Sequence, residues 1–150
     1  MGESTTLATG LYIALIHEQR ATYLAAGQTE AHCAALPHEG EVQAVETALT
    51  ALGHHVQLIP GIHALVQSLA ANEHAHWDLA FNMAQGFYGD AREAQVPALL
   101  EAYRIPYTFA DAATMALCQN KANAKVCLST SRGERGRGRG GGKVRIGGWG

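Results

Sequence analysis

The sequence has 150 residues, the usual size of one domain with a single hydrophobic core. Its formal net charge is −2, but residues 1–128 hold five Lys/Arg against twelve Asp/Glu, whereas residues 129–150 hold six against one. Three cysteines without CxxC spacing argue against a disulfide framework and against a zinc knuckle. The absence of a disulfide framework favours a reducing cytoplasm. Because no run approaches the ~20 apolar residues that span a bilayer, we also expect a soluble protein without a membrane partner.

The first predicted element is the continuous apolar run "LYIALI" at 11–16, which is typical of a strand buried on both faces of a parallel sheet. Residues 17–40 lack a clear period and predict a long loop with a helical turn within 21–27. A helix is predicted over 41–52, ending before Gly53. Its apolar face comprises Val42, Val45, Leu49 and Leu52.

Two further strands are predicted at 55–60 and 77–83, with a helix over 63–72 between them. That helix is expected to turn Leu65, Val66 and Leu69 inward. The resulting order βαβαβ favours an open parallel sheet with right-handed crossovers.

A helix beginning near Gln95 follows, and Pro97 is tolerated in its first turn. Its apolar face comprises Val96, Leu99, Leu100 and Tyr103. "IPYTF" at 105–109 predicts a short fourth strand, and Asp111 predicts an N-cap for a helix over 112–125 or for a broken pair of helices.

The predicted fold class is therefore α/β, an open, Rossmann-like parallel sheet of about four strands with helices on both faces. The α/β domain is expected over 11–128, after a disordered stretch at 1–10. Residues 129–150, "STSRGERGRGRGGGKVRIGGWG", are rich in glycine and arginine and show no apolar period. They are predicted to form a disordered tail.

Ligands of open α/β sheets bind beyond the carboxyl ends of the strands. These ends are expected at 17–20, 60–62, 82–93 and 109–111. The loop within 82–93 is the candidate ligand-binding loop, because its glycines let backbone amides approach a ligand and its charges are clustered. The residues concerned are Gly86, Gly89, Asp90, Arg92 and Glu93.

The same charges also have a purely structural interpretation. Asp90 and Glu93 near a helix start favour the helix dipole, and Arg92 can pair with either of them. The glycines match neither the dinucleotide fingerprint nor the P-loop pattern.

Other reactive residue types give weaker signals. His74 and His76 form a His-x-His pair, but no carboxylate or thiol at ligand spacing joins them, so no metal site is predicted. Cys118 and Cys127 are interpreted as small core residues, because no base can be paired with them. No residue is therefore predicted to be catalytic.

An ordered set of short motifs within 78–125 resembles the N-terminal domain of D-alanine–D-alanine ligases and their ATP-grasp relatives. The set begins with Phe81-Asn82 and the loop at 86–93. It continues with Ile105-Pro106-Tyr107-Thr108 and with "ALCQNK" at 116–121, followed by Lys125. "ETALTALGHHVQLIP" also looks like the first helix and second strand of this family.

The resemblance implies a ligase that uses ATP and Mg to join a carboxylate to an amine, with an amino acid or other carboxylate as its small-molecule substrate. It places Lys121 near the ATP phosphates. It also places Gly86, Gly89, Asp90, Arg92 and Glu93 at the border of the substrate pocket. A homodimer is compatible with it, whereas a nucleic-acid partner is not expected.

Several positions differ from the motifs of the ligase family. Gln85-Gly86 replaces the family's "HG", Asn120 replaces the aspartate of its DK pair, and "HEQRATYL" at 17–24 offers no clear counterpart to its "SxERE" loop. These changes argue against D-alanine specificity. Because the sequence after Lys125 does not match the ATP-grasp domain, we expect a truncated form that is inactive alone and binds neither ATP nor Mg tightly.

Two alternatives remain open. The segment "RGERGRGRGGG" resembles RGG-type sequences, in which spaced arginines contact RNA phosphates and bases. The negative charge of residues 1–128 opposes that interpretation. A bare ligand-binding or interaction domain of flavodoxin-like shape is the other alternative, although no phosphate loop follows the first strand.

Overall fold

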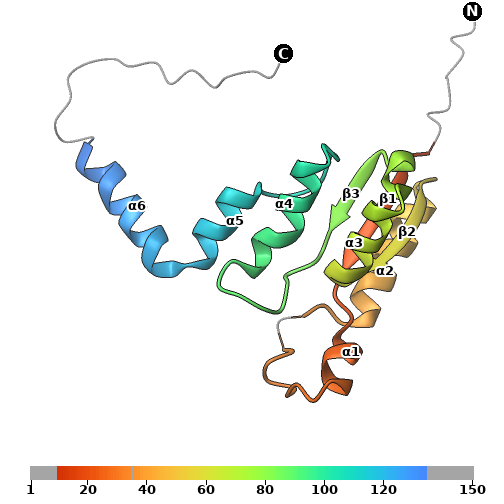
Figure 1. Cartoon of the computed structure of the whole chain (residues 1–150), viewed down its shortest axis with the longest axis horizontal. Helices are drawn as coiled ribbons and strands as arrows, with labels where there is room; N and C mark the ends of the chain where they lie inside the picture. The colour runs from red at the N-terminus through yellow and green to blue at the C-terminus, as the bar shows by residue number, and fades with distance from the viewer. Residues whose placement is uncertain (1–9, 35, 135–150) are drawn as a thin grey trace, which may run out of the picture.

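The computed structural model describes residues 10–34 and 36–134. Three strands and the helices around them alternate along the chain (Figure 1). In chain order the elements are β1 (Tyr12–His17), α1 (Arg20–Ala25), α2 (Glu39–Ala51), β2 (His55–Pro60), α3 (Gly61–Ala70), the 3-10 helix η1 (Glu73–His76), β3 (Leu79–Asn82), the 3-10 helix η2 (Arg92–Ala94), α4 (Gln95–Ala102), α5 (Ala112–Gln119) and α6 (Lys121–Glu134).

The three strands form a parallel sheet in the order β2-β1-β3, which confirms the predicted α/β class and βαβαβ order. β1 is central because its run of apolar side chains can be buried on both sides, and Ile13 through Ile16 are at most 2 % exposed. Tyr12 is level with His55 in one partner strand, and Ile13 is level with Leu79 in the other. All three strands therefore end at the same edge of the sheet.

One face of the sheet carries the main core. Because side chains alternate along a strand, Ala14, Ile16 and Ile59 share this face. They are buried with residues of α3, α4 and the adjoining segments, namely Leu65, Leu69, Trp77, Ala80, Ala84, Val96, Leu100 and Ile105. α3 and α4 therefore cover one face of the sheet.

The opposite face is covered by α2. Val42 and Gln43 of α2 line a surface hollow together with His17 of β1 and Leu58 of β2, whose side chains lie on this second face. Ile13 and Leu15 point the same way as His17 and are fully or almost fully buried. Helices therefore lie on both faces, as the sequence predicts.

The expected fourth strand at 105–109 is reduced to one parallel bridge between Ala80 and Tyr107. The amide of Ala80 donates to the Pro106 carbonyl at 2.8 Å, and the amide of Thr108 donates to the Ala80 carbonyl at 3.1 Å. Pro106 has no N–H to donate, and Phe109 has a φ of 77°, which leaves the extended conformation. A full strand does not form, so the sheet has three strands rather than about four.

The predicted cap and the broken pair of helices after it are both observed. The Asp111 carboxylate accepts a hydrogen bond from the Thr114 amide at 2.7 Å at the start of α5. Asn120 has extended backbone angles and separates α5 from α6. Figure 1 shows α5 and α6 leading away from the sheet after α4.

The helix α6 continues to Glu134, so it includes the first residues of the predicted tail at 129–150. Alanine and lysine in "KANAK" favour the helix, which then runs on into the polar residues. The rest of the predicted tail, 135–150, lies outside the described residues, as do residues 1–9 of the predicted N-terminal stretch.

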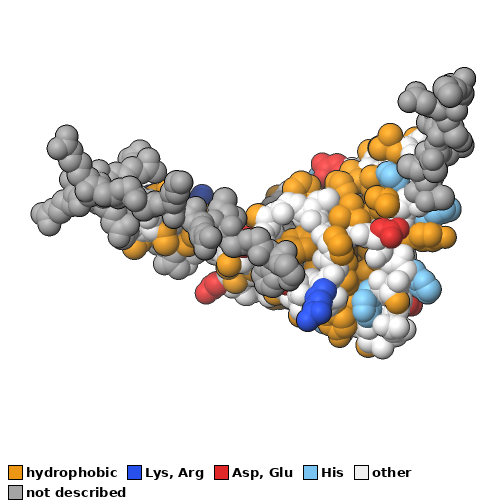
Figure 2. Space-filling view, turned by 90° about the horizontal axis from the view of Figure 1, so that it is seen from above, with side chains coloured by type: hydrophobic (Ala, Val, Ile, Leu, Met, Phe, Trp, Pro, Cys, Tyr) orange, Lys and Arg blue, Asp and Glu red, His pale blue; other side chains and the backbone are white. Residues whose placement is uncertain are grey.

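Several apolar side chains that the sequence places inside are exposed instead. Cys118 and Cys127 lie at the surface, which corrects their interpretation as core residues, whereas Cys33 is buried. The other exposed members of predicted apolar faces are Leu52, Val66 and Tyr103. Hydrophobic side chains accordingly occupy much of the surface in Figure 2. Among the described residues, no helix is both long enough and apolar enough to cross a membrane.

Candidate functional site

The carboxyl edge of the sheet holds a buried acidic residue, Glu18, directly after β1. Glu18 is 3 % exposed and follows His17, which is 7 % exposed. Charged groups are rarely buried this deeply unless they are hydrogen-bonded, so the partners of this carboxylate define the local architecture.

Glu18 joins α1 to the loop after β3. Its Oε2 accepts a hydrogen bond from the Tyr23 hydroxyl at 2.7 Å, and its Oε1 accepts one from the Gly86 amide at 3.2 Å. The Tyr23 ring stacks on Phe87, with ring centroids 4.3 Å apart. Burial and then the bond to Glu18 raise the pKa of Tyr23 above its ordinary value, so its hydroxyl stays protonated and continues to donate.

Two hollows adjoin at Gly86 and Phe87, which line both of them. The first has a volume of about 210 Å³ and lies over the ends of β1 and β2. Its lining includes Glu18, Tyr23, Gly61, His63 and Tyr88.

The second hollow has a volume of about 270 Å³ and lies between the β1–α2 connection and the loop after β3. Its lining consists of His32, Leu36, Gln85, Gly86, Phe87 and Arg92. The first hollow thus contains a carboxylate, whereas the charged and titratable side chains of the second are basic.

The structure brings part of the predicted substrate-binding set to these hollows. Gly86 has a φ of 66° and Gly89 a φ of 92°, conformations that favour glycine. A Cβ at Gly86 would overlap the backbone of Arg92, so the absence of a side chain allows this close approach. Gly86 and Arg92 line the second hollow, whereas Gly89, Asp90 and Glu93 line neither hollow.

The alternative interpretation, in which Arg92 pairs with a neighbouring acid, is not what the structure shows. In the part of the chain that is described, the one ion pair within 4 Å joins Arg20 to Glu30. Arg92 is half-buried without Asp90 or Glu93 as an ion-pair partner.

Lys121 and Glu93 lie outside the two hollows. Lys121 is exposed at the first residue of α6 and lines neither of the two hollows. The amide of Glu93 donates to Gln119 Oε1 at 3.3 Å, which connects η2 to the end of α5.

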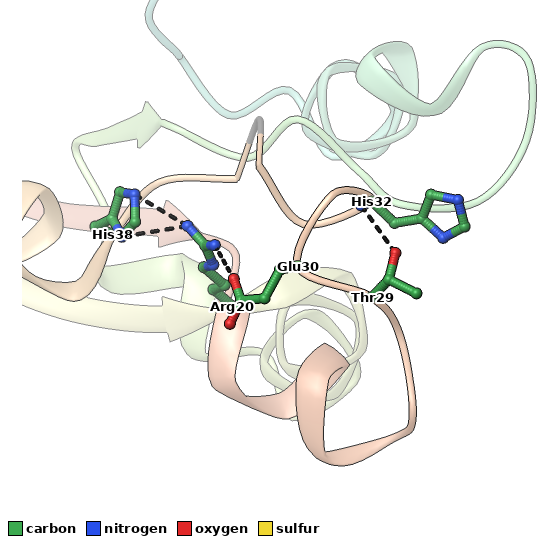
Figure 3. Close-up of polar contacts among 5 residues, drawn as sticks. All are labelled: Arg20, Thr29, Glu30, His32 and His38. Carbon is green, nitrogen blue, oxygen red and sulfur yellow. Dashed lines mark hydrogen bonds and ion pairs between the residues drawn. The ribbon is translucent and has the colours of Figure 1, made fainter.

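The β1–α2 connection is fastened by a polar cluster, which Figure 3 shows in detail. The Arg20 guanidinium is ion-paired with Glu30 and lies 3.0 Å from His38 Nε2. The amide of His32 donates to Thr29 Oγ1 at 3.3 Å, and the His32 ring points away from Arg20 (Figure 3). These contacts hold the segment that brings His32 to the second hollow.

Three residues of this edge were not predicted from the sequence: Glu18, Tyr23 and His32. A signal for Glu18 was present, because His17-Glu18 directly follows a fully apolar strand at a position where ligands bind. Tyr23 and His32 lie in a segment without periodicity, and their proximity to the loop after β3 depends on the tertiary fold.

Metal coordination has little support in the described residues. No group of three or more His, Cys, Asp or Glu side chains is placed so that it could hold an ion among the residues that the structure describes. His74, one member of the His-x-His pair, packs edge-on against Trp77 and Tyr103 instead.

The chain is similar to two curated ligases. It is 36 % identical over 90 residues to D-alanine–D-alanine ligase from Xanthomonas axonopodis pv. citri, and equally so to D-alanine–D-alanine ligase B from Xanthomonas campestris pv. campestris. Each match covers 57 % of this chain but only 27 % of the relative, so the chain spans about a quarter of their length. No protein-family profile and no solved structure matches the chain. The similarity supports a relationship to these ligases.

Proposed function

We propose that this chain is the substrate-side domain of an ATP-dependent ligase that joins a carboxylate to an amine, with a small amino acid or related acid bound at the carboxyl edge of the sheet. The observation that carries the proposal is the pair of adjoining hollows, one lined by the buried acid Glu18 and the other by the half-buried Arg92. Opposite charges on neighbouring sites suit a zwitterionic substrate.

The similarity to D-alanine–D-alanine ligases supports the same reaction class, because those relatives join two amino acids as their names state. The replacement of the family's "HG" by Gln85-Gly86 alters the lining of the second hollow itself. The substrate that we propose is therefore a small acid not restricted to D-alanine.

ATP and Mg belong to the proposed reaction rather than to the two hollows. Lys121 is proposed to lie near the ATP phosphates when the rest of a ligase is present, since it is exposed and begins a helix. Residues 135–150, including most of the Gly/Arg-rich segment, lie outside the described residues, and RNA binding remains the alternative function.

The proposed function is tested by titrating the full chain with small acids and following its amide NMR signals. D-alanine, L-alanine and D-lactate are expected to shift the signals of Gly86, Phe87 and Arg92, while signals of α6 stay in place. Two or three charged hydrogen bonds support a dissociation constant of about 1 mM, or about −4 kcal/mol. Shifts by none of these acids would contradict the proposal, and RNA-induced shifts in their place would favour the alternative.

A further inference from the structure

The second hollow contains two basic side chains from parts of the chain that are far apart in sequence. Arg92 belongs to η2, after β3, and His32 belongs to the connection between β1 and α2. The other lining residues are Leu36, Gln85, Gly86 and Phe87, so the lining contains no acidic side chain. The lining therefore combines two basic residues and a glutamine with a glycine and two apolar residues.

The guanidinium is available for a ligand. Arg92 is half-buried, and no described acidic side chain lies within 4 Å of it. A partly desolvated guanidinium without a carboxylate partner attracts an anion more strongly than an exposed one, because water screens it less. Its planar fork of N–H donors also matches the two oxygens of a carboxylate.

The backbone fixes the position of Arg92. Gly86 approaches it so closely that a Cβ at Gly86 would overlap the Arg92 carbonyl oxygen and lie 2.9 Å from the Arg92 Cβ. The Gly86 amide is in turn held by Glu18, which is itself bonded to Tyr23. The start of the Arg92 side chain is thus fastened, through Gly86, to the end of the central strand.

The segment that carries His32 is fastened independently. Arg20 holds Glu30 and His38, which lie on either side of His32 in the sequence, and Cys33 and Leu36 are buried next to it. His32 itself is exposed, and its ring is turned away from the Arg20 cluster (Figure 3). The ring is therefore free to contact a molecule in the hollow.

We infer that His32 and Arg92 together bind the carboxylate of a small organic acid in the 270 Å³ hollow, with Leu36 and Phe87 contacting its apolar part. This inference rests on the proposed function. It adds the two residues that bind the carboxylate, Arg92 from η2 and His32 from the β1–α2 connection. The volume lies just below the range of about 300–1000 Å³ that is typical of drug-sized ligand pockets, which suits a smaller molecule.

The test compares propionate with propionamide, which has nearly the same shape but no charge. Both are titrated into the full chain, and the amide signals of Gly86 and Phe87 and the ring signals of His32 are followed by NMR. Propionate is expected to shift these signals to saturation, whereas propionamide is expected to leave them unchanged. Equal shifts by both compounds would overturn the inference, because the site would then recognise only apolar shape.

Variants assign the effect to the two side chains. Arg92→Gln is expected to weaken propionate binding about tenfold to a hundredfold, and His32→Gln about twofold to tenfold. Arg104→Gln is the matched control, because Arg104 is exposed and lines neither hollow, and it should bind propionate as the unmodified chain does. If Arg92→Gln does not fold, the exposed His32→Gln variant carries the same test.

Two further outcomes separate the possible explanations. Inorganic phosphate that binds more tightly than propionate would overturn the assignment to a carboxylate and indicate a phosphate site. If alanine and propionate bind equally well with and without Arg92 and His32, this inference fails while the proposed function stands. If no acid binds anywhere on the carboxyl edge, both fail.

Discussion

Glu18 organises the candidate site at the scale of single residues. It directly follows the central strand, is almost fully buried, and uses its two carboxylate oxygens to hold α1 through Tyr23 and the loop after β3 through Gly86. Removing one donor from a buried carboxylate leaves that oxygen unsatisfied, which costs more than the net value of the hydrogen bond itself. Tyr23 is therefore the residue through which this arrangement can be tested with the smallest chemical change.

Tyr23→Phe is expected to lower the free energy of unfolding by about 1–3 kcal/mol, because it removes the donor to Glu18 but keeps a ring that can stack on Phe87. Tyr107→Phe is the matched control. Its hydroxyl donates to Glu101 at 2.6 Å, but Glu101 is exposed and can be solvated, so the loss should be smaller. Urea denaturation measures the free energy of unfolding of both variants. Equal losses would show that burial of Glu18 does not increase the cost of removing its hydrogen-bond donor.

The pH dependence of stability follows from the same tyrosines. Burial and then the bond to Glu18 raise the pKa of Tyr23, and burial and then Glu101 raise the pKa of Tyr107 to about 12. The folded chain therefore keeps protons that the unfolded chain releases near pH 10. The resulting stabilisation is complete below about pH 10 and is lost as the pH rises toward the folded values.

Urea denaturation at a series of pH values checks this expectation. The free energy of unfolding should be level up to about pH 9 and fall above about pH 10, and the fall should be shallower for Tyr23→Phe. A decline of the same slope in that variant would mean that Tyr23 ionises alike in the folded and unfolded chains.

At the scale of elements, the sequence correctly predicts the strands and helix starts that are marked by a continuous apolar run or a clear N-cap. β1 and β2 lie within one residue of their predicted bounds, and Asp111 caps α5 as expected. The prediction of a strand at 105–109 is wrong, because the short apolar run does not reveal that Pro106 and the left-handed Phe109 limit pairing to one bridge.

Helix faces are the least predictable part of the elements, because an apolar period fixes one side of a helix but not the width of the buried stripe. In α3, Leu65 is fully buried, whereas the neighbouring Val66 is 48 % exposed, contrary to the prediction that both point inward. Only the tertiary arrangement, in which α3 lies on β2 and β1, decides between them.

Leu65→Ala is accordingly expected to lower the free energy of unfolding by about 2–5 kcal/mol, through lost burial and the cavity left behind. Val66→Ala, one residue away in the same helix, should change it by no more than about 0.5 kcal/mol. Urea denaturation of the two variants under one set of conditions makes the comparison. A loss for Val66→Ala as large as that for Leu65→Ala would show that the exposed side of α3 is covered in solution.

At the scale of the whole molecule, the described chain divides into a sheet with helices on both faces and a helical extension formed by α5 and α6. Of the loop residues predicted to bind a substrate, Gly86 and Arg92 line a hollow, whereas Gly89, Asp90 and Glu93 line neither hollow. The sequence could not predict that Glu18 and His32 meet this loop, because their proximity follows from the parallel order β2-β1-β3 and from a connection without periodicity.

Hydrogen exchange is expected to follow this division. Amides of β1 are bonded to strands on both sides and are buried, so they should open only with global unfolding. α6 packs on α5, and its residues 125–129 are exposed, so its amides should exchange through local opening at much lower free energy. Exchange followed by mass spectrometry on the full chain separates the two regions, with α3 as an internal reference because it packs on the sheet. Protection of α6 equal to that of β1 would show that the helical extension is covered by a contact absent from the described chain, such as a second copy of it.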